Sequence, residues 1–279
     1  MIPFEFDYYK PETIRETINL YHDLDFIGKQ PLYYGGGTEF ISMARKHNIY
    51  SQAVIDIKGI PDLNIYEIRD DELVIGAAVT LTQIAELNLY PLLSKTVRRI
   101  ADHTIQDKIT LGGNIAGSII YRESLLPLMV ADADIVIAGR DGIQRLALKD
   151  RFDKRIKLDK GELICSLIIK NDFLDLPSIH VKRTKYEKID YPLITIVASM
   201  IKNKLNIAFS GLYDYPFRSS EIELILNDYS IQKDERVKKV IRSLGNSILE
   251  DLHGSAEYKK FLLHNILYET LENFEEASK

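Results

Sequence analysis

The chain has 279 residues, a hydrophobic fraction of 46%, a charged fraction of 28% and a net charge of −5, values that are ordinary for a globular protein. There is no excess of Lys and Arg to neutralise phosphates, which argues against a nucleic-acid-binding protein. No apolar stretch approaches the roughly 20 residues that span a bilayer, and the N-terminus lacks the basic and apolar regions of a signal peptide. We therefore expect a cytoplasmic protein that binds neither nucleic acid nor membranes.

The first 57 residues are predicted to form a β-α-β-α-β unit. Residues 4–8 alternate as in a strand, and Pro11 precedes a helical pattern. A short strand over 31–34 runs into three glycines. Thr38 is a candidate N-cap for the helix that follows, and residues 53–57 form the third strand.

The second part of the chain is predicted to be richer in strands. Residues 65–69 and 73–75 indicate a hairpin that turns at Asp70 and Asp71. In chain order, the other elements are helices over 81–87, 91–102 and 124–131, and strands over 135–138 and 162–169.

A third part follows the polar stretch 171–178, where we place a domain boundary. Strands are predicted over 179–185, 193–201 and 205–209, with a tight turn at 202–204. After Pro216 the pattern is helical to the end, with an amphipathic helix from about residue 256. The acidic end, residues 272–279, is expected to be solvated and frayed.

The single cysteine, Cys165, lies in an apolar run and is predicted to be a small buried residue. One cysteine cannot form an internal disulfide or hold an iron–sulfur cluster or thiolate zinc site. The histidines lack metal-ligand spacing, so we predict no metal site. We also find no convincing set of catalytic residues, so redox chemistry requires an organic cofactor or a partner.

The first glycine turn, residues 33–40 (YYGGGTEF), is the most informative segment. Glycines allow unusual backbone angles and close approach to a ligand, and successive N–H groups at a helix N-terminus form a nest for anions. A diphosphate is the natural ligand, with the Thr38 hydroxyl as a further donor. On this view a Gly36→Val change abolishes binding and leaves the fold largely intact. The motif matches neither G-x-G-x-x-G nor a P-loop, and a plain strand-to-helix turn explains it equally well.

The second glycine turn, residues 110–114 (TLGGN), is a further candidate for binding a diphosphate through its backbone. Two such turns indicate two backbone loops that hold one diphosphate from opposite sides. A tight loop between elements is the alternative.

These motifs together resemble a known family. The chain contains, in this order, the first glycine turn, the strand 54–63, the "L-x-I-G-A-x-x-T" hairpin at 73–80 and the second glycine turn. This order resembles that of the FAD-binding medium subunits of molybdenum hydroxylases. This family includes xanthine dehydrogenase and aerobic carbon monoxide dehydrogenase. The resemblance implies an α+β fold, with a PCMH-type FAD-binding domain in two α/β subdomains and a C-terminal domain of a small antiparallel sheet packed with helices. The implied domains are residues 1–57, 58–173 and 178–279.

The resemblance also implies which residues bind FAD, and it implies no catalytic or metal-binding residue. The implied FAD-binding residues are Tyr33, Tyr34, Gly35, Gly36, Gly37, Thr38, Glu39, Phe40, Ile100, Thr110, Leu111, Gly112, Gly113, Asn114, Glu123, Ile164 and Lys182. For Ile100 and Ile164, core packing is an equally good explanation. Lys182 falls on a family lysine near the flavin, and its alternative is an exposed strand lysine.

One segment departs from the family pattern. The family has Ser-Pro-x-x-Asp after the second glycine turn, whereas this chain has residues 119–123 (IIYRE), so that Glu123 stands at the position of the aspartate. Arg122 is either a partner of Glu123 or a surface charge. The apolar residues of 119–124 are a candidate docking surface for a partner, with burial as the alternative.

The family implies the function of an oxidoreductase subunit that is inactive on substrate alone. FAD takes electrons from a [2Fe–2S] subunit, which receives them from a molybdopterin-binding large subunit, and passes them to NAD⁺ or another acceptor. Two alternatives remain. One is a self-contained flavin reductase of the same fold, and the other is a scaffold subunit that has lost FAD, as the missing Ser-Pro suggests.

Overall fold

Two units make up the chain in this computed structural model, which describes residues 2–187, 189–245 and 247–277. The N-terminal unit comprises Met1–Leu89, Asp102–Gly117 and Asp132–Asn171, and the C-terminal unit comprises Tyr90–Ala101, Ser118–Ala131 and Asp172–Lys279. Two segments from the middle of the chain thus belong to the C-terminal unit. The division into domains 1–57, 58–173 and 178–279 stays a prediction.

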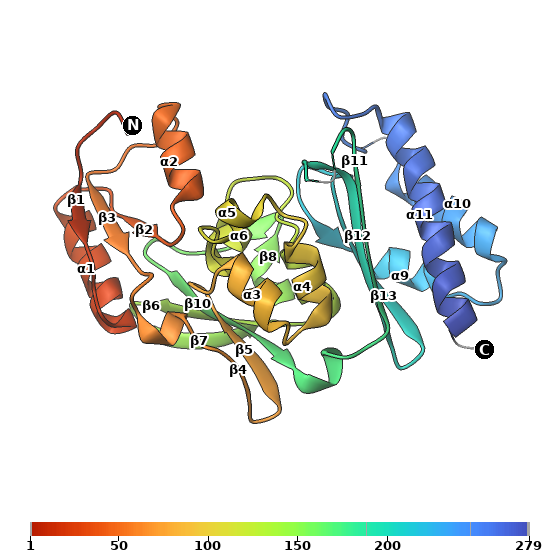
Figure 1. Cartoon of the computed structure of the whole chain (residues 1–279), viewed down its shortest axis with the longest axis horizontal. Coiled ribbons are helices and arrows are strands. Elements are labelled where there is room, and N and C mark those ends of the chain that lie inside the picture. Colours follow the sequence, from red (N-terminus) through yellow and green to blue (C-terminus); the bar gives the residue numbers. More distant parts are fainter. Residues whose placement is uncertain (1, 188, 246, 278–279) are drawn as a thin grey trace. The chain divides into compact units, whose positions relative to one another are not determined.

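A three-stranded parallel sheet begins the N-terminal unit, in the order β1-β3-β2. Its elements are β1 (Asp7–Tyr9), α1 (Ile14–Phe26), β2 (Leu32–Tyr34), α2 (Thr38–Arg45) and β3 (Ala53–Asp56). The two crossovers run in opposite directions. Because such crossovers are right-handed, α1 and α2 lie on opposite faces of the sheet (Figure 1). The predicted β-α-β-α-β unit is confirmed, but Gly37 rather than Thr38 is the N-cap of α2.

A five-stranded antiparallel sheet forms the rest of this unit's framework, in the order β4-β5-β10-β6-β7. The strands are β4 (Tyr66–Arg69), β5 (Glu72–Gly76), β6 (Asp134–Gly139), β7 (Gly142–Ala147) and β10 (Leu163–Lys170). Asp70 and Asp71 have φ of 50° and 64°, which a two-residue type I′ hairpin requires. The predicted hairpin is therefore confirmed, whereas β7 was not predicted, because its residues are mostly exposed and its apolar residues do not alternate with polar ones.

Short elements complete the N-terminal unit. They are α3 (Leu81–Leu87), α5 (His103–Gln106), α6 (Leu111–Ala116), α8 (Leu148–Arg151), β8 (Phe152–Asp153), β9 (Arg155–Ile156) and a 3-10 turn, η1 (Pro61–Leu63); a second such turn, η2 (Asn171–Phe173), reaches the boundary between the units. Helix α3 has the predicted bounds, and Thr80 and Gln83 form a capping box at its start. Cys165 is buried in β10, as predicted, and burial raises the pKa of its thiol to about 12.

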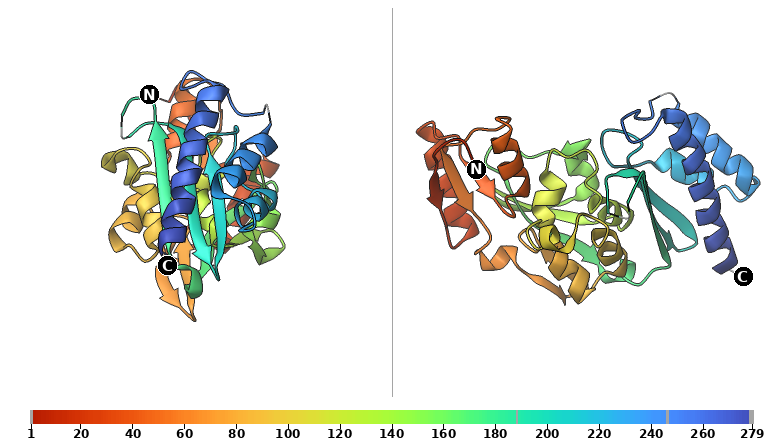
Figure 2. Two further views of the ribbon diagram at one scale, coloured as in Figure 1. Left: turned by 90° about the vertical axis from the view of Figure 1, so that its right-hand side faces the viewer. Right: turned by 45° about the horizontal axis from the view of Figure 1, so that its top comes forward.

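The C-terminal unit is built on an antiparallel sheet, β11-β12-β13-β14. Its elements are α4 (Pro91–Val97), α7 (Leu125–Val130), β11 (Ser178–Thr184), β12 (Pro192–Ile201), β13 (Lys204–Ser210), β14 (Phe217–Arg218), α9 (Ser220–Leu226), α10 (Lys233–Leu244) and α11 (Ala256–Ala277). Helix α11 runs along one face of the sheet, as both views of this unit show (Figures 1 and 2). On this face Ile194, Ile196 and Phe209 pack against Leu263 and Leu267 of the helix.

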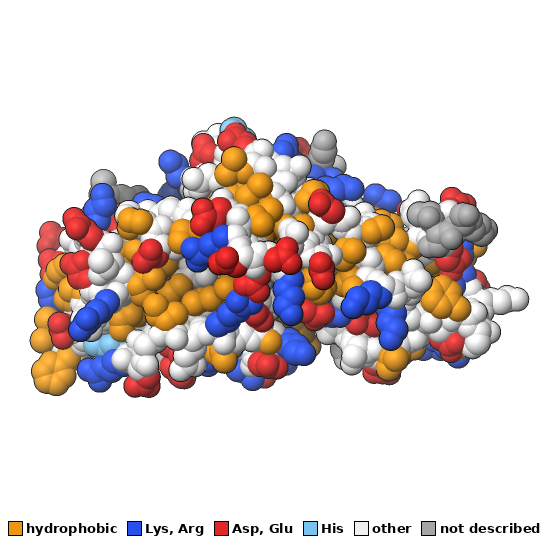
Figure 3. Space-filling view, turned by 90° about the horizontal axis from the view of Figure 1, so that it is seen from below, with side chains coloured by type: hydrophobic (Ala, Val, Ile, Leu, Met, Phe, Trp, Pro, Cys, Tyr) orange, Lys and Arg blue, Asp and Glu red, His pale blue; other side chains and the backbone are white. Residues whose placement is uncertain are grey.

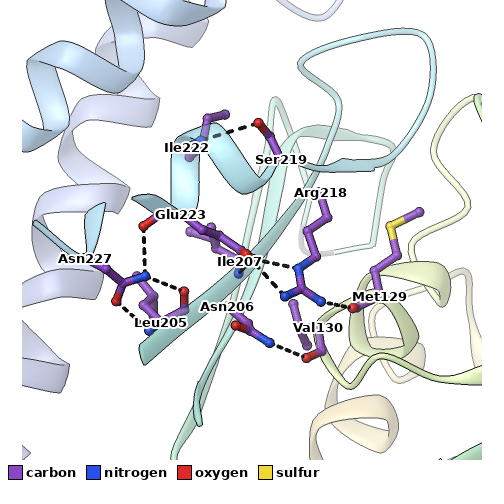
Figure 4. Close-up of polar contacts among 10 residues, drawn as sticks. All are labelled: Met129, Val130, Leu205, Asn206, Ile207, Arg218, Ser219, Ile222, Glu223 and Asn227. Carbon is purple, nitrogen blue, oxygen red and sulfur yellow. Dashed lines mark hydrogen bonds and ion pairs between the residues drawn. The ribbon is translucent and has the colours of Figure 1, made fainter. Parts of the chain in front are cut away.

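The opposite face of the same sheet carries polar side chains, and the segments 90–101 and 118–131 cover it. Asn206 of β13 donates to the carbonyl of Val130 at 3.0 Å, and Arg218 of β14 donates to the carbonyl of Met129 at 2.6 Å (Figure 4). Ser210 donates to the carbonyl of Tyr121 at 2.8 Å. The last carbonyl groups of a helix have no N–H donor within that helix. For α7, Asn206 and Arg218 of the sheet supply these donors.

The C-terminal part of the chain differs from its prediction in two places. The short strand β14 follows Pro216 before the helices begin. The acidic end is not frayed over its described length, because α11 continues to Ala277, Phe274 is buried, and Arg236 forms an ion pair with Glu275. The last two residues, Ser278 and Lys279, lie outside the described residues. The burial of Phe274 was not predicted, because the residues around it in the sequence are mostly acidic.

Charged side chains of both signs are interspersed with apolar ones on the face drawn in Figure 3. No helix among residues 2–187, 189–245 and 247–277 combines the length and hydropathy that crossing a bilayer requires.

The buried position of Phe274 generates a prediction about stability. We expect Phe274→Ala to lower the free energy of unfolding by about 3–5 kcal/mol, because it removes a large buried ring and leaves a cavity. Chemical denaturation measures the change, and Glu276→Ala, at an exposed position two residues on, should cost under about 0.5 kcal/mol. Equal stability of the two variants would show that the end of α11 does not pack.

Candidate functional site

The first glycine turn lies at the carboxyl end of β2, where the chain enters α2. Gly37 has φ of 72°, a left-handed angle that glycine adopts without strain. A Cβ on this residue would overlap the ring of Tyr34. Both the backbone angle and the packing therefore require glycine at position 37.

The backbone N–H groups of this turn have no hydrogen-bond partner among the described residues. Within residues 2–187, 189–245 and 247–277, no hydrogen bond uses the N–H of Gly35, Gly36, Gly37 or Thr38 as donor, while Ile41 donates to the carbonyl of Gly37 at 2.9 Å. Four consecutive donors at the start of a helix form a concave site for an anion. This observation fits a diphosphate, as the sequence predicts.

The second glycine turn is different, because the fold already uses its N–H groups. Leu111 donates to the carbonyl of Val79 at 2.8 Å, and Gly112 donates to the carbonyl of Ala77 at 2.9 Å. Gly113 donates to the Thr110 hydroxyl at 3.2 Å, which caps α6, and Asn114 donates to the Thr110 carbonyl at 2.9 Å. These four N–H groups therefore already have partners within the protein. That the two turns hold one diphosphate from opposite sides stays a prediction.

The two turns contact each other directly. A Cβ on Gly36 would overlap the backbone carbonyl of Lys108, and a Cβ on Gly35 would lie 2.8 Å from the Thr110 hydroxyl. Gly36 is thus needed for the approach of two protein backbones. The expectation that Gly36→Val leaves the fold largely intact is wrong, because the new side chain must displace the chain at Lys108.

Other predicted residues of the N-terminal unit have packing roles. Tyr33 donates from its hydroxyl to the carbonyl of Gly161 at 2.7 Å, and burial raises its pKa. The Phe40 ring lies 5.9 Å from that of Phe6 in an edge-on arrangement. A carboxylate oxygen of Glu39 lies against Gly117, and Ile164 is buried in β10.

Ile100, Glu123 and Lys182, by contrast, belong to the C-terminal unit. Ile100 is half-buried. Glu123 and Lys182 form an ion pair at 2.8 Å, and their side chains are only 5% and 2% exposed. The interpretation of Lys182 as an exposed strand lysine is therefore wrong.

Further hydrogen bonds complete this buried pair. Thr195 donates to the second carboxylate oxygen of Glu123 at 2.6 Å, and Lys182 donates to the carbonyl of Arg99 at 2.7 Å. Burial raises the pKa of Glu123, and the neighbouring Lys182 ammonium opposes that rise. Thr195 was not predicted, although it is paired directly with Lys182 across β11 and β12.

Most of residues 119–124, the candidate docking loop, are buried, while Ile119 and Ile120 are half-buried. Tyr121, Arg122, Glu123 and Ser124 are buried, and the Tyr121 ring stacks on Tyr191 with centroids 5.1 Å apart. Arg122 is not a surface charge. Across the described part of the chain, no group of three His, Cys, Asp or Glu residues is placed to hold a metal ion.

The buried pair generates a second prediction. We expect Lys182→Met to lower the free energy of unfolding by about 3–5 kcal/mol, because it leaves the Glu123 carboxylate buried without its counter-ion. Adding Glu123→Gln should recover at least half of the loss. Denaturation curves provide the measurement, and Arg183→Met, at the exposed neighbouring position, is the control. A loss below about 1 kcal/mol for Lys182→Met would contradict the assignment.

Comparison with known proteins identifies the family. A family model described as the FAD binding domain in molybdopterin dehydrogenase matches residues 4–170. The glyceraldehyde dehydrogenase medium chain of Sulfolobus acidocaldarius is 25% identical over 100% of both chains, and the carbon monoxide dehydrogenase medium chain of Afipia carboxidovorans is 24% identical over 100% of both.

Solved structures share the fold over nearly the whole chain. Quinoline 2-oxidoreductase from Pseudomonas putida 86 has a TM-score of 0.84 at 18% identity, covering 98% of this chain and 97% of that one. Carbon monoxide dehydrogenase from Hydrogenophaga pseudoflava has a TM-score of 0.84 at 21% identity, covering 96% of each chain. The expected PCMH-type fold with an antiparallel C-terminal sheet is confirmed. The chain therefore belongs to the family of FAD-binding subunits of the molybdopterin dehydrogenases, and its cofactor is FAD.

Proposed function

We propose that the chain is the electron-transfer subunit of a molybdopterin-dependent dehydrogenase of the xanthine dehydrogenase type. In this proposal it takes electrons from a [2Fe–2S] subunit and passes them to NAD⁺ or another acceptor. FAD, when bound, supplies a ring that exchanges electrons singly or in pairs. The observation that carries the proposal is that the four consecutive N–H groups from Gly35 to Thr38 have no hydrogen-bond partner in the described part of the chain.

The two glycine turns have different tasks in this proposal. The first turn donates its N–H groups to the FAD diphosphate, and the N-terminus of α2 adds positive potential. Thr110 of the second turn packs against Gly35, and Lys108, just before that turn, packs against Gly36. These contacts fix the shape of the first turn. A rigid site lowers the entropic cost of binding.

The partners follow from the cysteine count and from the names of the relatives. One cysteine in 279 residues cannot hold an iron–sulfur cluster. Several relatives are named as medium chains, and one, from Eubacterium barkeri, is named as a nicotinate dehydrogenase FAD-subunit. We infer that a [2Fe–2S] subunit and a molybdopterin-binding large subunit bind this chain, and that the isolated chain does not oxidise substrate.

Purification of the tagged chain from its native cells tests the function. We expect a complex that contains iron, molybdenum and one releasable FAD per chain, and whose flavin absorbance falls when substrate is added. The isolated chain should bind FAD but not respond to substrate. Recovery of a homo-oligomer alone, with NAD(P)H-dependent reduction of a small substrate, would instead support a self-contained flavin reductase.

The Thr38 side chain provides a test of the first glycine turn that leaves its backbone unchanged. Its hydroxyl has no hydrogen-bond partner among the described residues. We expect Thr38→Val to raise the FAD dissociation constant about five-fold, the effect of losing one hydrogen bond of about 1 kcal/mol.

Fluorescence titration of the apoprotein with FAD measures this change. Ser42→Ala removes an exposed hydroxyl one turn later in α2, and its FAD affinity should equal that of the wild type. If both variants bind FAD as the wild type does, the Thr38 hydroxyl does not contact the diphosphate.

A further inference from the structure

Lys58 lies just beyond the carboxyl end of β3, beside the first glycine turn. Its Nζ is 2.7 Å from Oδ1 of Asp56 and 4.2 Å from the centroid of the Tyr34 ring. The same ring occupies the space where a Cβ on Gly37 would lie. One aromatic side chain thus contacts both the ammonium and the glycine turn.

A buried carboxylate holds this ammonium in place. The Asp56 side chain is 5% exposed and that of Lys58 is 44% exposed. Asp56 also accepts the backbone N–H of Lys58 at 3.0 Å and the hydroxyl of Tyr8. Burial raises the pKa of Asp56, but the hydrogen bonds from Lys58 and Tyr8 outweigh burial and hold it below its usual value. The carboxylate is therefore ionised at neutral pH and anchors a partly exposed cation.

The Lys58 ammonium has more N–H donors than its hydrogen bond to Asp56 uses. An ammonium group carries three N–H bonds, and Asp56 takes one of them. The first glycine turn offers only partial positive charge from its N–H groups and from the end of α2. Glu39, in the first turn of this helix, opposes the binding of an anion there. A full positive charge nearby would therefore strengthen the binding of a dianionic diphosphate at this turn.

We propose that Lys58 is an FAD-binding residue whose ammonium, held by Asp56 and the Tyr34 ring, pairs with the diphosphate bound at the first glycine turn. The inference rests on the proposed role of that turn and adds the cation that completes it. Lysine binds phosphates as a point charge, and an anchored lysine loses less freedom when the anion arrives.

Titration of the apoprotein with FAD at several salt concentrations tests the proposal. We expect Lys58→Gln to raise the FAD dissociation constant about five- to ten-fold at low salt, because one partly exposed charge contact is lost. The dependence of FAD affinity on salt should also become shallower, since screening then acts on one charge fewer. A purely structural role of Lys58 would not change that dependence.

The matched control is Lys46→Gln, at the exposed residue that follows the last turn of α2. It removes the same charge from the other end of the helix and should leave FAD affinity and its salt dependence unchanged. The unfolding curve of the Lys46→Gln apoprotein should equal that of the wild type, whereas Lys58→Gln should unfold cooperatively at a somewhat lower denaturant concentration, because the buried Asp56 loses its counter-ion. If Lys58→Gln binds FAD with wild-type affinity and salt dependence, the inference is wrong and the proposed function stands. If the wild-type chain itself binds no FAD, the proposed function fails and the inference fails with it.

Discussion

The contact between Gly36 and the backbone carbonyl of Lys108 is the constraint on which the shape of the proposed cofactor site depends. It brings together two turns that are far apart in the sequence. The second turn uses its own N–H groups to bond to Val79, Ala77 and Thr110, so it is a rigid support. The first turn packs on this support, and among the described residues its N–H groups have no hydrogen-bond partner. This difference is why we propose that the first turn binds the anion and the second turn supports it.

The C-terminal unit depends on a comparable contact between distant segments. The polar face of its sheet donates hydrogen bonds to the carbonyls of Met129 and Val130 in the segment 118–131 (Figure 4). The Glu123–Lys182 ion pair also joins this segment to the sheet, and the hydrogen bond from Lys182 to the carbonyl of Arg99 joins the segment 90–101 to it. Removing one partner of the ion pair would leave a buried charge.

The sequence predicts the elements well wherever a periodic pattern or a turn signal is strong. The hairpin at Asp70 and Asp71, helix α3 and the strands on either side of the turn at 202–204 all appear in the structure. The failures have physical causes. An exposed edge strand such as β7 lacks the apolar alternation of a half-buried strand, and the acidic end of α11 conceals the single buried ring of Phe274.

The candidate site could be predicted only in part, because sequence patterns do not show which hydrogen bonds are already made. The two glycine turns have similar sequences, yet among the described residues the N–H groups of the second have partners and those of the first have none. The burial of Lys182 depends on Glu123, which is 59 positions away in the sequence. Lys58 follows the carboxyl end of a strand in a parallel sheet, where ligands commonly bind. That position is the feature of the sequence from which its proposed role could have been predicted.

The proposed binding of the FAD diphosphate by the N–H groups of the first glycine turn can be measured by amide hydrogen exchange of the chain with and without FAD. We expect FAD to slow exchange strongly at Gly35, Gly36, Gly37 and Thr38, and to change it little at Leu111 and Gly112, whose N–H groups are already bonded. Protection by FAD that appears at the second turn and leaves the first unchanged would show that the first turn does not bind the diphosphate.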